Sequence, residues 1–105
     1  MSDIAVTPKP PYYAVIFSSK TADSLEGYEN TADEMLTLAA RQPGYLGVES
    51  ARNDIGITVS YWRDEAAIMA WRRQIEHKEV RNKGKTTWYS SYTVRVCKVE
   101  RQYSK

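Results

Sequence analysis

The sequence predicts an α+β domain in which an antiparallel sheet is covered on one face by two helices. Three observations predict it: four stretches rich in aromatic and β-branched residues, two stretches with apolar residues at helical spacing, and a length of 105 residues. This length is near the commonest size of one domain. We therefore expect a single domain over residues 12–105, preceded by a flexible N-terminal arm, residues 1–11, which carries three of the four prolines.

The first predicted strand covers residues 12–20, YYAVIFSSK, a run of aromatic and β-branched residues short enough for a buried strand. A polar loop leads from it to the first predicted helix, which begins at Thr31 and stops at Pro43-Gly44. Thr31 and Glu34 have the spacing of a capping box. Apolar residues then recur at helical intervals, at Ala32, Met35, Leu36 and Ala39.

The second and third predicted strands are residues 45–52, YLGVESAR, and 56–62, GITVSYW. The residues between them include Asn53 and Asp54, which together with Gly56 suit a hairpin turn, so the two strands should pair antiparallel. In the third strand the side chains alternate, and one face is more polar than the other. The two sets are Ile57, Val59 and Tyr61 against Thr58, Ser60 and Trp62.

The second predicted helix begins after Asp64, a natural N-cap, and shows one apolar stripe, Ile68, Trp71 and Ile75. At about 100° per residue, His77 would lie about 120° and Val80 about 180° from Trp71. We therefore expect the helix to break between Gln74 and His77. A second segment would then turn its own face inward, formed by His77, Val80, Arg81 and Gly84.

The last predicted strand, residues 86–101, is unusually long. At ~3.3 Å per residue, about fourteen of its residues would already reach roughly 45 Å, more than the width of a small sheet, so part of it should pair with, or wrap around, a second subunit. The resulting order, βαββαβ, is that of the ferredoxin-like fold. The sheet face without helices would present apolar and aromatic residues to water, and burying it against a second copy predicts a homodimer.

The amino-acid composition indicates which kinds of partner and which cellular compartment to expect for the protein. The net charge of +2, from 15 basic and 13 acidic residues, is too balanced for a nucleic-acid binder. The single cysteine, Cys97, excludes an internal disulfide and fits a reducing cytoplasm. No apolar stretch resembles a signal peptide or approaches the ~20 residues of a membrane span. We expect a soluble, cytoplasmic protein without nucleic-acid or membrane partners.

A set of residue marks along most of the chain resembles one family. The marks are Pro43-Gly44, Glu49-Ser50, Tyr61-Trp62, Trp71, His77, Gly84 and Trp88-Tyr89. In them the chain resembles the antibiotic biosynthesis monooxygenase (ABM) domain family, and the likeness extends from Tyr12 to Tyr103. The resemblance implies a dimeric ferredoxin-like α+β barrel with a small apolar pocket between the sheet and the helices of each subunit.

Members of this family carry out different reactions, so the function has to be argued from the site. The family includes cofactor-free monooxygenases that oxidise polycyclic aromatic metabolites to quinones, haem-degrading enzymes and members without assigned activity. The resemblance favours a cofactor-independent monooxygenase of a small aromatic or quinol-type metabolite. A non-catalytic dimeric module that binds a small apolar ligand is the alternative, and a haem-degrading monooxygenase is the second alternative.

The haem-degrading branch would have an Asn on the first strand and a His ligand about ten residues after a Trp early in the second helix. Trp71 matches that Trp, but the position ten residues later is Arg81, and His77 comes four residues too early. The segment AVIFSSK of the first strand also contains no Asn. We therefore expect no bound cofactor, and haem is the less favoured case.

Cofactor-free oxygenation requires a phenolic substrate that becomes an anion in an apolar pocket, with a base and one or two hydrogen-bond donors. The catalytic candidates are His77, as the base, and Trp71. The candidates for binding substrate are Tyr61, Trp62, Trp88 and Arg81, whose planar fork suits an anion. Each aromatic residue can equally belong to the core or the dimer interface. For His77 a structural role at a helix junction is favoured over a role as base or haem ligand.

Overall fold

The structure is a computed structural model that describes residues 3–21, 36–81 and 89–105. The side chains of residues 21, 77–81, 89 and 90 lie outside this description. Four strands and one long helix follow one another in the order β1 (Tyr12–Thr21), β2 (Tyr45–Arg52), β3 (Gly56–Trp62), α2 (Glu65–Arg81) and β4 (Tyr89–Val99). Residues 36–40 form a further helical segment before β2.

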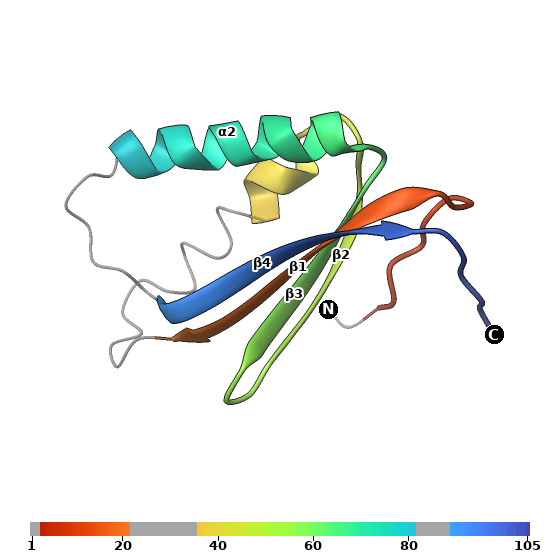
Figure 1. The fold of residues 1–105 in the computed structure, drawn as a ribbon, viewed down its shortest axis with the longest axis horizontal. Coiled ribbons are helices and arrows are strands. Elements are labelled where there is room, and N and C mark those ends of the chain that lie inside the picture. The colour runs from red at the N-terminus through yellow and green to blue at the C-terminus, as the bar shows by residue number, and fades with distance from the viewer. Residues whose placement is uncertain (1–2, 22–35, 82–88) are drawn as a thin grey trace.

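The strands form one antiparallel sheet in the order β2-β3-β1-β4. Figure 1 shows α2 and the helical segment of residues 36–40 on the same side of this sheet. The predicted α+β class and ferredoxin-like arrangement are therefore confirmed. The predicted strand bounds agree with β1, β2 and β3 within a residue, whereas the proposed capping box of Thr31 and Glu34 lies outside the described residues.

The core lies between the helices and the middle of the sheet. Directly opposite residues of antiparallel strands share a face, so the pairs Tyr13–Trp62 and Val15–Ser60 place these four side chains on the helix side. Trp62 is completely buried there. The other buried members of the cluster are Val15, Ala39, Ala67 and Ile68. The residues next in sequence, such as Tyr12 and Tyr61, consequently point to the helix-free face.

The start of α2 is held close to the start of β2. The Ala67 backbone N–H donates to Asp64 Oδ1 over 2.8 Å, so Asp64 is the predicted N-cap. This hydrogen bond is the main reason that the pKa of Asp64 lies below its ordinary value. Gly44 has a φ of +90°, and a Cβ on it would lie 2.7 Å from the Cβ of Ala67. A glycine is therefore needed at this crossing.

The predicted break in the second helix is wrong. Helix α2 runs without interruption from Glu65 to Arg81, through the segment Gln74–His77. Its apolar stripe is needed only where the helix covers the core, at Ala67, Ile68 and Trp71. Beyond that point the residues EHKEVR contain no Gly or Pro, and most are good helix formers, so backbone hydrogen bonds carry the helix onward without an apolar face.

In the described part of the chain, no helix is long and apolar enough to cross a membrane.

Candidate functional site

Two indole rings form the centre of the helix side. Trp62 of β3 and Trp71 of α2 stack with ring centroids 4.9 Å apart and an interplanar angle of 26°. The ring of Tyr45 meets Trp62 edge-on at 5.6 Å. The Trp62 indole N–H donates to the hydroxyl of Ser60 over 2.8 Å, so this buried donor is satisfied and its ring is held in one orientation. The sequence-predicted residues Trp62 and Trp71 are thus brought together.

The Trp71 indole differs from its neighbour in one respect. Among the described residues, its Nε1 is a buried side-chain donor without a hydrogen-bond partner. A buried donor left in this state costs about 1–3 kcal/mol. Such a group is expected where a ligand oxygen or an ordered water completes the site, and it gives Trp71 a hydrogen bond to offer.

The helix side continues beyond the indole pair as an apolar surface on β1 and β4. The register places Phe17 opposite Val94 and Val15 opposite Val96 on this side. The ring of Phe17 stacks on that of Tyr92 at 5.5 Å. Although Tyr92, Val94 and Val96 lie on the side that carries the helices, about half or more of each side chain is exposed. We name Phe17, Tyr92, Val94 and Val96 the β4 floor; it offers a flat apolar surface to a ring system.

A cation lies at the hairpin end of the same side. The Arg52 guanidinium donates to the hydroxyl of Ser19, which is buried. It crosses directly over Gly56, where any Cβ would overlap the guanidinium group. Ser19 of β1 lies opposite Gly56 of β3 on one side and opposite Tyr92 of β4 on the other. Arg52, which crosses over Gly56, is therefore in the same row across the sheet as Tyr92 of the β4 floor. Arg52 is not among the residues that the sequence predicts for the site, because only the pairing of β1 with β3 reveals what its side chain reaches.

Tyr61 lies on the opposite, helix-free face. Its hydroxyl donates to Glu49 Oε1 over 2.6 Å, and its ring meets that of Tyr12 edge-on at 6.0 Å. Burial of the phenol, reinforced by its hydrogen bond to Glu49 and by the negative charge of that carboxylate, raises the pKa of Tyr61 to about 12. The phenol is therefore neutral at ordinary pH. The structure separates Tyr61 from Trp62 and Trp71, although all three are residues that the sequence predicts for one site.

The remaining candidates are only partly described. His77 and Arg81 belong to the last turns of α2 through their backbone, and their side chains lie outside the described residues. Trp88 lies outside the described residues altogether. The roles proposed for these three residues stay predictions.

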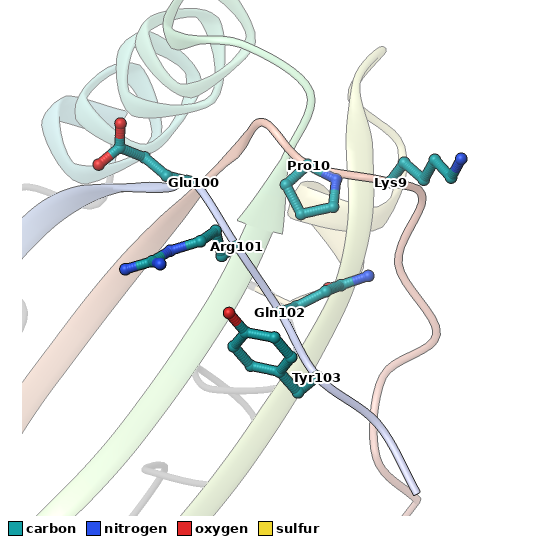
Figure 2. Close-up of a pocket in the computed structure, with 6 residues that line it drawn as sticks. All are labelled: Lys9, Pro10, Glu100, Arg101, Gln102 and Tyr103. Atoms are coloured by element: carbon teal, nitrogen blue, oxygen red, sulfur yellow. The ribbon is translucent and has the colours of Figure 1, made fainter.

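A separate hollow lies between the residues that precede β1 and those that follow β4. It is shallow and open, has a volume of about 360 Å³ and is lined by Lys9, Pro10, Glu100, Arg101, Gln102 and Tyr103. Figure 2 shows the side chains of Lys9 and Arg101 extending in opposite directions, with no common point at which the two cations could meet one ligand. No indole lines this hollow. We therefore place the candidate site at the Trp62–Trp71 pair and the β4 floor.

Comparison with known proteins assigns the chain to a family. The model of the antibiotic biosynthesis monooxygenase family matches residues 11–83. The chain belongs to this family. The protein is also 54% identical over 104 residues to "Uncharacterized protein YqjZ" of Bacillus subtilis (strain 168), a match that covers 97% of this chain and 91% of that protein. Neither finding names a substrate.

Two solved structures show the same fold. SnoaB, a cofactor-independent oxygenase from Streptomyces nogalater studied as a mutant, superposes with a TM-score of 0.71 at 12% identity, covering 90% of this chain and 98% of SnoaB. A mutant of MhuD with two manganese protoporphyrin IX molecules per active site superposes with a TM-score of 0.70 at 13% identity, covering 89% and 99%. At these identities the likeness shows the fold alone.

Proposed function

We propose that this protein is a cofactor-independent monooxygenase that oxidises a small aromatic, quinol-type molecule bound on the helix side of its sheet. The observation that carries the proposal is the buried, unpartnered indole N–H of Trp71, on the same side of the sheet as an exposed apolar floor. An aromatic ring with one polar oxygen would bury its ring on Phe17 and Tyr92 and direct the oxygen to Trp71. Membership of the monooxygenase family supports the reaction class.

The reaction needs little from the protein besides a base and a donor. A base removes a proton from the substrate, and the resulting anion places negative charge on the oxygen that faces Trp71. The N–H of Trp71 stabilises that charge most strongly in a site from which water is excluded. The electron-rich anion of an anthrone-type substrate then reacts with dioxygen: its ring CH₂ becomes C=O, one oxygen atom of dioxygen enters the product, and the other leaves as water with the two hydrogens. His77 is our candidate for the base.

We further propose that the protein works as a homodimer that buries the helix-free face of the sheet. On this face Ile16 and Val59 are only half-buried, and Ile57 is 45% exposed. An apolar sheet face of this kind is stable in water when a second copy covers it. The equivalent face of the partner has the same composition, as a two-fold interface requires.

The test is oxygen uptake by metal-free, chelator-treated protein with a panel of anthrone-like phenols and hydroquinones. Turnover that survives the chelator supports the proposal, and Trp71→Phe should lower it by about a hundredfold, the usual cost of losing one donor to a developing oxyanion. His77→Ala tests the base, and Met69→Leu, at an exposed position of the same helix, is the matched control. Binding of these phenols without oxygen uptake would support the non-catalytic ligand-binding module instead.

A haem titration separates the remaining alternative. If the protein were a haem-degrading enzyme, the Soret band of haem would shift when haem binds to it. His77→Ala would abolish that shift if His77 were the iron ligand. We expect no specific shift, because the spacing from Trp71 to His77 does not suit that role.

A further inference from the structure

One side of the N-terminal arm, here called its inner side, lies against the helix-free face of the sheet and is held there by hydrogen bonds. The backbone N–H of Ala5 donates to Glu49 Oε2 over 2.9 Å, which leaves Oε1 of the same carboxylate to Tyr61. The Thr7 hydroxyl donates to the hydroxyl of Tyr12 over 2.9 Å. Glu49 and Tyr12 lie on β2 and β1, so two strands of the sheet hold the arm.

The residues after β4 reinforce this attachment. Gln102 accepts a hydrogen bond from the Tyr12 hydroxyl and lies 3.0 Å from the Thr7 hydroxyl. Its side-chain amide also reaches the carbonyl of Pro8 over 3.4 Å. Figure 1 shows the two ends of the chain running beside each other at one end of the sheet. The arm is thus bound on both of its flanks.

A glycine beneath the arm makes room for it. A Cβ on Gly47 would lie 3.0 Å from the Cβ of Ala5, which is tighter than ordinary side-chain contact. The register places Gly47 opposite Tyr61, on the helix-free face of β2. The arm therefore lies directly on the backbone of an edge strand of the sheet.

The outer side of the arm carries two apolar residues. Successive side chains of an extended segment point in opposite directions, so with Ala5 and Thr7 directed to the sheet, Ile4 and Val6 point away from it. Their exposed fractions are 84% and 92%. Since hydrogen bonds fix the backbone between them, these side chains cannot reach the core of their own subunit. Their exposure is a cost that contact with another apolar surface would remove.

The direction of Ile4 and Val6 identifies that surface. They point outward from the face that the homodimer of the proposed function buries, and β2 is at one edge of it. Each strand of a sheet is rotated by about 20–25° from its neighbour. Two twisted sheets packed face to face consequently diverge at their corners, and an extra layer of chain on an edge strand fills such a corner.

We propose that the arm is part of the dimer interface, in which Ile4 and Val6 of each subunit pack against a second copy of this chain and close the corner over β2. This inference rests on the proposed homodimer but not on the proposed oxidation. The arm lies outside residues 11–83, which match the family model. Glu49, Tyr12 and Gln102 position the arm, and its two outer side chains make the contact.

The test compares dimer dissociation constants by sedimentation equilibrium for the full chain and its variants. The double variant Ile4→Asp/Val6→Asp places four carboxylates in the dimer interface, and we expect dissociation to become at least about 100-fold easier. Gly47→Leu should also weaken the dimer, because it lifts the arm while leaving both outer side chains unchanged. Met69→Asp, at an exposed position of α2, is the matched control and should leave the dimer dissociation constant unchanged.

The inference would be overturned if the double variant dimerised as tightly as the parent chain and as the control, Met69→Asp. Far-UV circular dichroism checks that each variant is folded, which is expected for the substitutions of Ile4, Val6 and Met69 because these positions are exposed. A parent chain that sediments as a monomer would overturn both the homodimer and the role of the arm. Oxygen uptake by that monomer would still support the proposed oxidation, so the two failures are distinguishable.

Discussion

The hydrogen bond between Trp62 and Ser60 allows a quantitative test of the core. Ser60 is 2% exposed and Trp62 is completely buried, so no water reaches the 2.8 Å bond between them. Ser60→Ala removes the acceptor and leaves a buried indole N–H unsatisfied. The expected loss is about 1–3 kcal/mol in the free energy of unfolding, the penalty for orphaning a buried donor. For a domain of this size it corresponds to a fall in Tm of about 4–20 °C.

A double-mutant cycle isolates that interaction from other effects of the substitution. Trp62→Phe removes the donor, so in its background Ser60→Ala has no indole N–H to orphan and should cost close to nothing. The coupling free energy between the two sites should therefore be about 1–3 kcal/mol. The assay is urea unfolding followed by circular dichroism. All four proteins are compared at one concentration, because a dimer's stability depends on concentration.

An equal cost of Ser60→Ala in both backgrounds would refute this reasoning. The loss would then arise from the cavity or from local packing of the strand, and the Trp62 ring would not be oriented by its hydrogen bond. A changed urea dependence in one variant only would show that the two-state comparison does not apply.

Three further substitutions test other parts of the structure. Gly44→Ala should lower the free energy of unfolding by about 1–3 kcal/mol in urea titrations, because the new alanine would have to adopt a positive φ and its Cβ would clash with Ala67. Tyr61→Phe should flatten the loss of stability between pH 10 and 12: the raised pKa of Tyr61 stabilises the fold below pH 10, and this contribution disappears as the pH rises through about 12. Asp64→Ala should lower Tm at neutral pH, and the difference from the parent chain should vanish as acid protonates Asp64 below its ordinary pKa of 3.8.

The strands could be predicted from the sequence because each has a local signal. Alternation of side chains and a hairpin turn determine where β2 and β3 begin and end, and neither depends on the rest of the chain. The continuity of α2 could not be predicted in this way. The stripe of Ile68 and Trp71 reports where a helix packs, whereas the helix itself extends as long as its residues favour it.

The sequence does not determine which side chains belong to the candidate site, because it leaves open which face of each strand meets the helices. Alternation indicates that Tyr61 and Trp62 point to opposite faces, but which of them meets the helices depends on the pairing with β1 and on the position of α2. Arg52 was missed for the same reason, since Ser19 and Gly56 lie beside it only through strand register. Long-range pairing therefore determines which side chains share a site.

The division of the sheet into two faces also separates two kinds of experiment. A ligand on the helix side can contact the indole of Trp71 but not the phenol of Tyr61, because the sheet lies between them. Substitution of Trp71 should therefore change oxygen uptake, while substitution at Glu49, which holds both Tyr61 and the arm, should change dimer stability. If Glu49→Ala reduced turnover in a preparation that remained fully dimeric, the two faces would be coupled through the four-stranded sheet. The division between a catalytic side and an interface side would then be incorrect.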